Sequence, residues 1–245
     1  VDPSDHPGEA AYVLGLCEED QEPTVGAVIG GRPADPGFRD YLRRFQEDDR
    51  VKGVRQVLHS PNTPPGFCLA PEFVTGARLL GEQGLCMDLC MRPTELSDAG
   101  KLADQCPDTR FVLDHCGNAD PKAFLGDSKR GGDEAPWHEA EAWKRDVAEL
   151  AKRENVVCKI SGIVVRAPKD DWGVEDLAPI VNHCLKEFGP RRVLFGGDWP
   201  VCTLVAELRE WIEALREIIA NRPEAERRGL FRDNALRFYK LSSHE

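Results

Sequence analysis

Two residue types suited to hydrolysis, an aspartate and a histidine, each follow a short apolar run of the sequence. Asp198 comes after two glycines that close the run Arg192–Phe195, and His115 comes directly after the run Arg110–Asp114. An aspartate can take a proton from water, and a histidine can polarise a carbonyl or protonate a leaving oxygen. The same two side chains could instead ligate one divalent ion such as zinc. We therefore expect Asp198 and His115 to be catalytic, with or without a metal.

Other polar side chains follow the remaining apolar runs or interrupt them. Arg55 lies inside the run Val51–Leu58, and a buried arginine needs an anionic partner, either a structural one or a carboxylate of the substrate. The further residues expected to contact the substrate are His59, Arg92, Asn118, Ser161 and Trp199. Each also has a structural alternative, such as a salt bridge or a backbone hydrogen bond. Their convergence at strand ends is the main argument for an enzyme with a small-molecule substrate.

The elements that must position these side chains are short apolar strands alternating with amphipathic helices. The expected strands are Val25–Ile29, Val51–Leu58, Leu85–Cys90, Arg110–Asp114, Val156–Ser161 and Arg192–Phe195. The expected helices are Pro36–Asp49, Glu72–Gln83, Leu96–Gln105, Trp137–Asn155, Glu175–Phe188, Thr203–Ala220 and Pro223–Tyr239. Strands that are apolar throughout are typical of a parallel sheet covered on both faces. An open doubly wound sheet and a (β/α)8 barrel both fit, and both place the site beyond the carboxyl ends of the strands.

Composition narrows the class of protein. The 32 Lys and Arg residues against 43 Asp and Glu give a net charge of −11, which argues against a nucleic-acid surface. No apolar run is long enough to span a bilayer, and no signal pattern opens the chain. The nine cysteines are an odd number without a repeated CxxC, so we expect reduced, mostly buried thiols in a cytoplasmic protein. We expect one domain over residues 1–245, with a polar, aperiodic connection at Gly117–Pro136.

Three motifs carry a resemblance to a known family. The segments FVLDHCGNADP (Phe111–Pro121), VVCKISG (Val156–Gly162) and LFGGDWPVC (Leu194–Cys202) resemble the amidohydrolase-related family, and within it the lactonases of sugar lactones and pyrone dicarboxylates. The resemblance implies a (β/α)8 barrel that hydrolyses a lactone or a related cyclic ester or amide. It implies that Asp198 activates water or binds metal, that His115 faces the carbonyl or the metal, and that Arg55 contacts a substrate carboxylate.

One departure from the family leaves alternatives open. Members begin with a strand carrying His-x-His, and this chain has no such motif; its opening residues resemble the end of a second barrel unit. We therefore expect a barrel that lacks its first one or two β/α units. Besides a metal-dependent or metal-independent lactonase, the sequence is compatible with a decarboxylase or hydratase of the same superfamily, or with a truncated barrel that does not catalyse.

Overall fold

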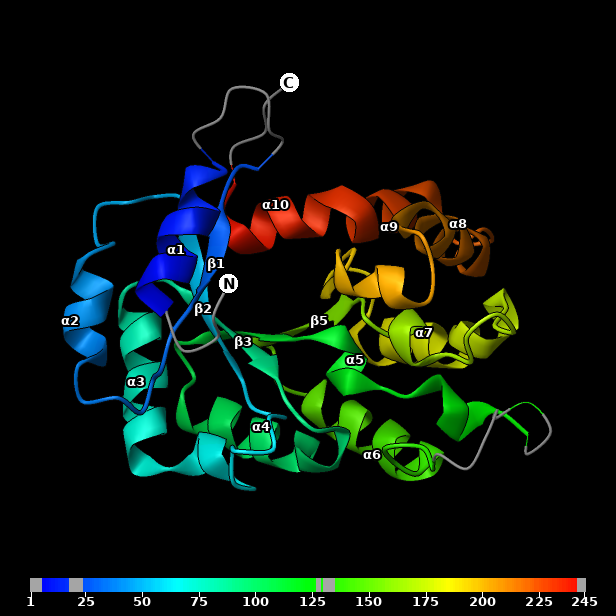
Figure 1. The fold of residues 1–245 in the computed structure, drawn as a ribbon, viewed down its shortest axis with the longest axis horizontal. Coiled ribbons are helices and arrows are strands. Elements are labelled where there is room, and N and C mark those ends of the chain that lie inside the picture. The colour runs from blue at the N-terminus through cyan, green and yellow to red at the C-terminus, as the bar shows by residue number, and fades with distance from the viewer. Residues whose placement is uncertain (1–5, 18–23, 127–128, 130–134, 242–245) are drawn as a thin grey trace.

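A parallel sheet of six strands forms the centre of the computed structural model, which describes residues 6–17, 24–126, 129 and 135–241 (Figure 1). The strands are β1 (Ala27–Gly30), β2 (Val51–Val57), β3 (Cys86–Cys90), β4 (Arg110–Leu113), β5 (Val156–Ile160) and β6 (Val193–Phe195). All six predicted strands are confirmed. Their spatial order is β1-β2-β3-β4-β5-β6, and every neighbouring pair is parallel.

This consecutive order distinguishes between the two predicted architectures. A doubly wound sheet reverses its strand order at a switch point, whereas a barrel adds each strand beside the previous one. The sheet is therefore of the TIM-barrel type. Within the described residues β1 pairs with β2 alone and β6 with β5 alone, so six strands are joined in one open series. The expectation that one or two further units belong before them stays a prediction.

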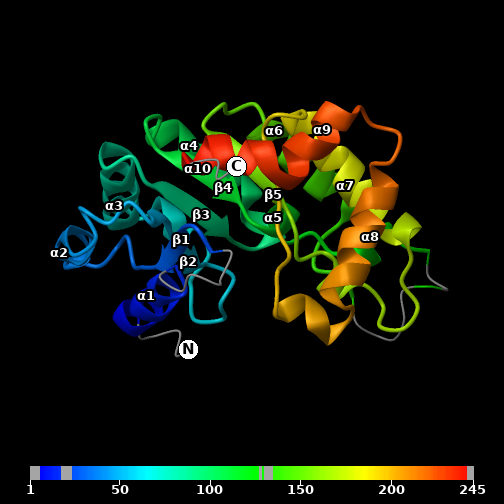
Figure 2. The ribbon, with the colours of Figure 1, turned by 90° about the horizontal axis from the view of Figure 1, so that it is seen from above.

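Helices cover the outer face of the sheet (Figures 1 and 2). They are α1 (His6–Gly15), α2 (Phe38–Arg43), α3 (Pro71–Glu82), α4 (Leu96–Gln105), α6 (Ala140–Leu150), α7 (Val174–Phe188) and α8 (Leu208–Ile218), with α1 beside β1 at one edge. A short turn, α5 (His115–Asn118), follows β4, and α9 (Glu224–Arg228), a π-helical turn (Gly229–Asp233) and α10 (Asn234–Tyr239) end the described chain. Most of the apolar core lies between the outer face and these helices.

Three predicted helices are shorter than expected. The helix predicted over Pro36–Asp49 is helical only over Phe38–Arg43, and the other two are shorter for identifiable reasons. The helix expected from Trp137 starts at Ala140, because the Trp137 amide donates to Asp120 and the His138 ring accepts from the Asp120 amide, which holds these residues against the preceding loop. The helix expected from Thr203 divides into a 3-10 turn and α8, because Glu207 is the N-cap residue of α8 and its backbone N–H donates to the Glu210 carboxylate.

The inner face of the sheet differs from the outer face, because successive side chains of a strand alternate between faces. Near the amino ends of the strands it carries a small apolar layer, comprising Cys86, Val112, Val157 and Leu194. Phe238 and Tyr239 of α10 pack on this layer. Towards the carboxyl ends the inner face becomes polar, with Asp88 on β3 and Lys159 on β5. This change of polarity marks the carboxyl end as the place for chemistry.

Candidate active site

His115 and Asp198, the two residues expected to be catalytic, lie side by side beyond the carboxyl ends of β4 and β6. The His115 Nε2 and Asp198 Oδ1 atoms are 3.8 Å apart, and both side chains are mostly buried, with 15% and 14% of their surface exposed. The His115 Nδ1 atom lies 2.9 Å from the Ser161 hydroxyl oxygen, which fixes the orientation of the ring. The fold thus brings together the residues that follow β4, β5 and β6, as expected.

The backbone that carries His115 is unusual. His115, Cys116, Gly117 and Asn118 all have positive φ angles, of 54°, 54°, 70° and 54°, and Asp198 has a φ of 52°. The left-handed region costs roughly 1–2 kcal/mol for a residue other than glycine. Such strained conformations cluster at functional sites, where the surrounding structure holds them. Both candidate catalytic side chains are thus presented by strained backbone.

Buried contacts hold the turn in this conformation. Asn118 Nδ2 donates to the Met91 carbonyl oxygen over 2.8 Å, and the Trp143 indole donates to the Cys116 carbonyl oxygen over 3.0 Å. Asn118 is only 8% exposed. The Asn118 side-chain amide therefore stabilises this turn, whereas the sequence predicted that it contacts the substrate.

A buried ion network lies beneath this pair, on the inner face. Lys159 Nζ is 2.7 Å from Asp88 Oδ2 and 2.6 Å from Asp114 Oδ1, and both carboxylates are almost completely buried. Burial raises the pKa of Asp88 to about 6, because Lys159 offsets only part of the desolvation. Burial also acts on Asp114, but Lys159, His115 and Arg55 together lower its pKa. Asp88 was not among the predicted site residues, although it interrupts the apolar run Leu85–Cys90 just as Arg55 interrupts the run Val51–Leu58.

Asp198 has a more basic carboxylate than an ordinary aspartate. Desolvation raises its pKa, while electrostatic interactions with His115 and Arg55 partly counteract the rise. A raised pKa makes the carboxylate a better proton acceptor at neutral pH. The environment of Asp198 therefore suits a general base.

Arg55 is placed near the site but is not the buried arginine expected from the sequence. Its side chain is 46% exposed, and its Nη1 atom lies 3.9 Å from Asp114 Oδ2. Its neighbour in the register of β1 is Gly30, which has no side chain to cover it. The Asp114 Oδ2 atom accepts no hydrogen bond from the described residues. Arg55 thus keeps donors free on the inner face.

The remaining expected substrate contacts divide into two groups. Arg92 donates to the Ser60 and Thr63 carbonyl oxygens and pairs with Glu95, so it holds the loop after β2 rather than facing the site. Ser161 is 1% exposed and contacts His115, which makes it a positioning residue.

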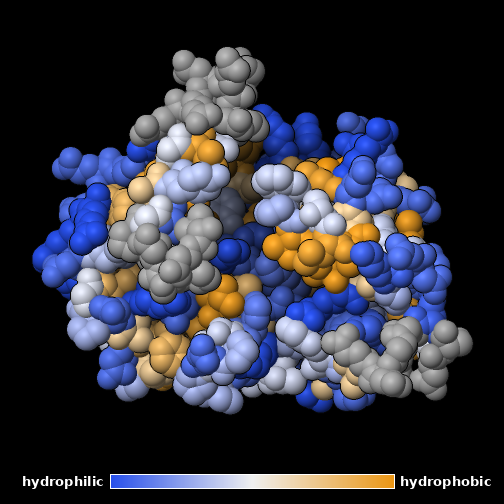
Figure 3. Space-filling model, viewed as in Figure 1, coloured by the Kyte–Doolittle hydropathy of each residue, from blue (hydrophilic) through white to orange (hydrophobic). Residues whose placement is uncertain are grey.

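Two of the expected contacts remain accessible. His59 lies beside Trp137, with ring centroids 6.2 Å apart, and desolvation followed by the charge of Arg166 lowers its pKa. Trp199 is 69% exposed, and with Val201 and Leu204 it forms an exposed apolar group in the segment after β6. Figure 3 shows apolar surface over this segment and a hollow beside it.

A cavity of about 760 Å³ lies at the other end of the sheet and is not this site. It is lined by charged residues near the amino ends of the strands, among them Arg39, Glu82 and Arg110. In barrels of this type the chemistry occurs at the carboxyl end, and the amino end serves stability. We therefore assign the candidate site to His115 and Asp198.

The described residues offer few complete metal sites. Groups of three or more potential ligands that converge within 4.8 Å in the described part of the chain are Cys116 with Cys158 and Cys184, and Cys90 with Asp114 and His115. Asp198 belongs to neither group. Catalytic zinc usually has three protein ligands, and the pair of His115 and Asp198 alone falls short of that number. Among the described residues, no helix has both the length and the apolar character needed to cross a membrane.

Comparisons with known proteins agree with the fold and with the predicted family. The L-fucono-1,5-lactonase of Burkholderia multivorans is 29% identical over 95% of this chain and 77% of its own length. An amidohydrolase from the same organism, solved with bound HEPES, superposes with a TM-score of 0.83 at 26% identity, covering 96% of this chain and 80% of that one. A second crystal form, with bound zinc, gives a TM-score of 0.82 at the same identity and coverage. The sequence profile of the amidohydrolase family matches residues 5–241, and the chain belongs to this family of hydrolases.

Proposed function

We propose that this protein hydrolyses the cyclic ester of a sugar acid, with Asp198 as the general base and His115 as the group that polarises the carbonyl. The observation that carries the proposal is the 3.8 Å approach of these two side chains at the carboxyl end of the sheet. The similarity to an L-fucono-1,5-lactonase supports the substrate class.

Each residue has a defined part in the proposed reaction. Asp198 takes a proton from a water molecule, whose oxygen attacks the lactone carbonyl carbon. His115, oriented by Ser161, donates a hydrogen bond to the carbonyl oxygen as negative charge develops there. The ring C–O bond then breaks, and the proton held by Asp198 passes to the leaving oxygen. The product is the open hydroxy acid, with no change in oxidation state.

Arg55 and the accessible residues His59 and Trp199 are the proposed substrate contacts. The partly exposed guanidinium of Arg55 can donate to a hydroxyl or carboxylate of the substrate. Trp199 provides an apolar surface for the face of a sugar ring. A carboxylated lactone therefore fits the site at least as well as a neutral one.

A similar amidohydrolase structure contains bound zinc. If this protein binds a divalent ion, His115 and Asp198 would be two of its ligands. The described residues supply these two donors and no third that converges with both. No step of the proposed reaction is therefore routed through a metal.

The decisive experiment compares wild type with Asp198→Asn on a panel of sugar lactones, following acid release with a pH indicator. A general base contributes about 10²–10⁴-fold to the rate, so we expect kcat to fall by that factor while the folded structure is kept. Asp170→Asn is the matched control, because Asp170 is exposed and also has a positive φ, of 65°.

Two outcomes would overturn the proposal. Full activity of Asp198→Asn on any substrate of the panel would remove the assigned base. Release of carbon dioxide from aromatic acids, with no lactone hydrolysed, would favour the decarboxylase alternative.

A further inference from the structure

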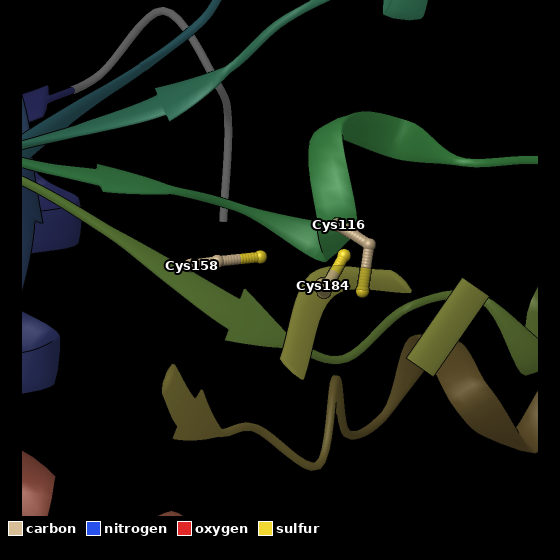
Figure 4. A group of neighbouring side chains, drawn as sticks. All are labelled: Cys116, Cys158 and Cys184. Carbon is tan, nitrogen blue, oxygen red and sulfur yellow. The ribbon is translucent and has the colours of Figure 1, made fainter. Parts of the chain in front are cut away.

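Three cysteine sulfurs converge behind the active site, on the other side of the sheet from Lys159. Cys158 points from the outer face of β5, Cys184 comes from α7, and Cys116 comes from the turn after β4 (Figure 4). Their sulfur atoms all lie within 4.8 Å of one another, and each residue is 0% exposed. Three elements that are far apart in the sequence thus place three thiols next to one another.

The spacing of these sulfurs is close to that of a three-sulfur metal site. Three sulfurs at 2.3 Å from a central ion, in one plane with it, are about 4.0 Å from each other. Sulfurs within 4.8 Å need to approach by less than an ångström. No fourth histidine, cysteine, aspartate or glutamate joins the group among the described residues. Zinc strongly prefers four ligands in structural sites, whereas Cu(I) accepts three sulfurs.

We propose that Cys116, Cys158 and Cys184 form a binding site for one soft, thiophilic metal ion of the Cu(I) type, separate from the catalytic pair. Each thiol loses its proton to solvent as its sulfur–metal bond forms. The site consists only of soft donors in a dry core, which selects against hard ions such as Mg²⁺ or Ca²⁺.

The backbone supports this assignment independently. Cys116 has a φ of 54°, and cysteine is not among the residue types that tolerate this region well. The strained conformation directs its side chain towards Cys184 (Figure 4). The same turn provides an entry path, because local opening of residues 115–118 would uncover the Cys116 sulfur. The remaining cysteines, apart from Cys90, belong to no such group of ligands in the described structure.

The site would be coupled to the catalytic pair through one peptide bond. Cys116 directly follows His115, so an ion held by Cys116 would restrain the turn that presents the catalytic ring. Amide hydrogen exchange in residues 115–118 would then slow when the ion is bound. This consequence does not depend on which substrate the enzyme hydrolyses.

The test uses the whole, reduced protein, titrated anaerobically with Cu(I) in competition with a chromophoric Cu(I) chelator. We expect one equivalent to be bound by wild type, with three sulfur neighbours in its X-ray absorption spectrum. Cys184→Ala should lose this equivalent, and Cys184→Ser is the second variant if the alanine protein does not fold. Cys68→Ala, which removes a buried thiol outside the group, should keep it.

Three results would overturn the proposal. Wild type could fail to compete for Cu(I), or the Cys184 variants could bind as tightly as wild type. Alternatively, Cys90→Ala could lose the ion while Cys184→Ala keeps it, which would place binding at the group of Cys90, Asp114 and His115 instead. All three results are read from metal binding and not from lactone hydrolysis, so the two proposals are tested separately.

Discussion

Replacing Lys159 with methionine removes the one ammonium shared by two buried carboxylates. Lys159 Nζ lies 2.7 Å from Asp88 and 2.6 Å from Asp114, whose side chains are 2% and 0% exposed. Methionine has a similar length but no charge, so the variant keeps most of the volume and leaves both acids without this partner. Removing one member of a buried pair costs about 3–5 kcal/mol. We expect the free energy of unfolding, measured by urea denaturation at neutral pH, to fall by that amount.

The loss should depend on pH in a defined direction. Desolvation raises the pKa of both acids and Lys159 is the largest contribution that lowers it, so without Lys159 we expect both folded-state pKa values to lie above the unfolded ones. The folded variant should then bind more protons than the unfolded chain as the pH falls. In wild type this already holds for Asp88, but the pKa of Asp114 is lowered. The stability difference between variant and wild type should therefore shrink as the pH falls from neutral towards 4.

An exposed ion pair supplies the matched control. Lys152 lies 2.6 Å from Glu149, but both side chains are more than half exposed, so Lys152→Met should cost far less stability than Lys159→Met. Equal losses in the two variants, or a loss in Lys159→Met that does not change with pH, would refute the assignment of a buried charge network.

Three further predictions follow from the site. Because desolvation raises the pKa of Asp198, the acid limb of the kcat/KM profile should lie at a higher pH than the value of 3.8 for an ordinary aspartate. Arg55→Met should move this acid limb to still higher pH, because Arg55 lowers the pKa of Asp198. A limb that does not move would show that Arg55 has no effect on the pKa of the base. Gly162→Ala would place a Cβ atom 2.6 Å from the His115 ring at a φ of +68°, so it should reduce kcat beyond any change in Gly189→Ala, whose φ is +71° and whose surroundings are open. Protein treated with a chelator, and shown by elemental analysis to be free of metal, should retain lactonase activity. Activity that is lost on treatment and restored by zinc would contradict this prediction.

The strands, and the placement of His115 and Asp198 beyond their carboxyl ends, were predictable from the sequence, because each buried strand is apolar up to the point where its polar end begins. Asp198 and His115 could be found in this way. Arg92 follows β3 in the same pattern, yet its donors are used by loop carbonyls, a long-range contact that spacing does not reveal. Asp88 could not be assigned from the sequence in this way, because its partner Lys159 lies 71 positions away in the chain.

The convergence of the thiols was not predictable either. Cys116, Cys158 and Cys184 are 26 to 68 positions apart in sequence, and each taken alone is an ordinary buried cysteine. Only the packing of α7 on β5 brings two of them together, and only the turn after β4 adds the third. The lengths of α6 and α8 were overestimated for a related reason, since helix ends depend on caps and loop contacts more than on periodicity.

The turn at residues 115–118 has one further consequence, which concerns chirality. Four successive positive φ angles describe a backbone that mirror-image amino acids adopt without strain. In an ordinary helix a D-residue is disruptive, but here D-asparagine at position 118, introduced by chemical ligation, would match the backbone that the L-residue is forced to adopt. The chain uses histidine, glycine and asparagine at three of the four positions, the residue types that tolerate this conformation best. The candidate catalytic histidine, His115, is thus carried by a short segment of reversed backbone handedness.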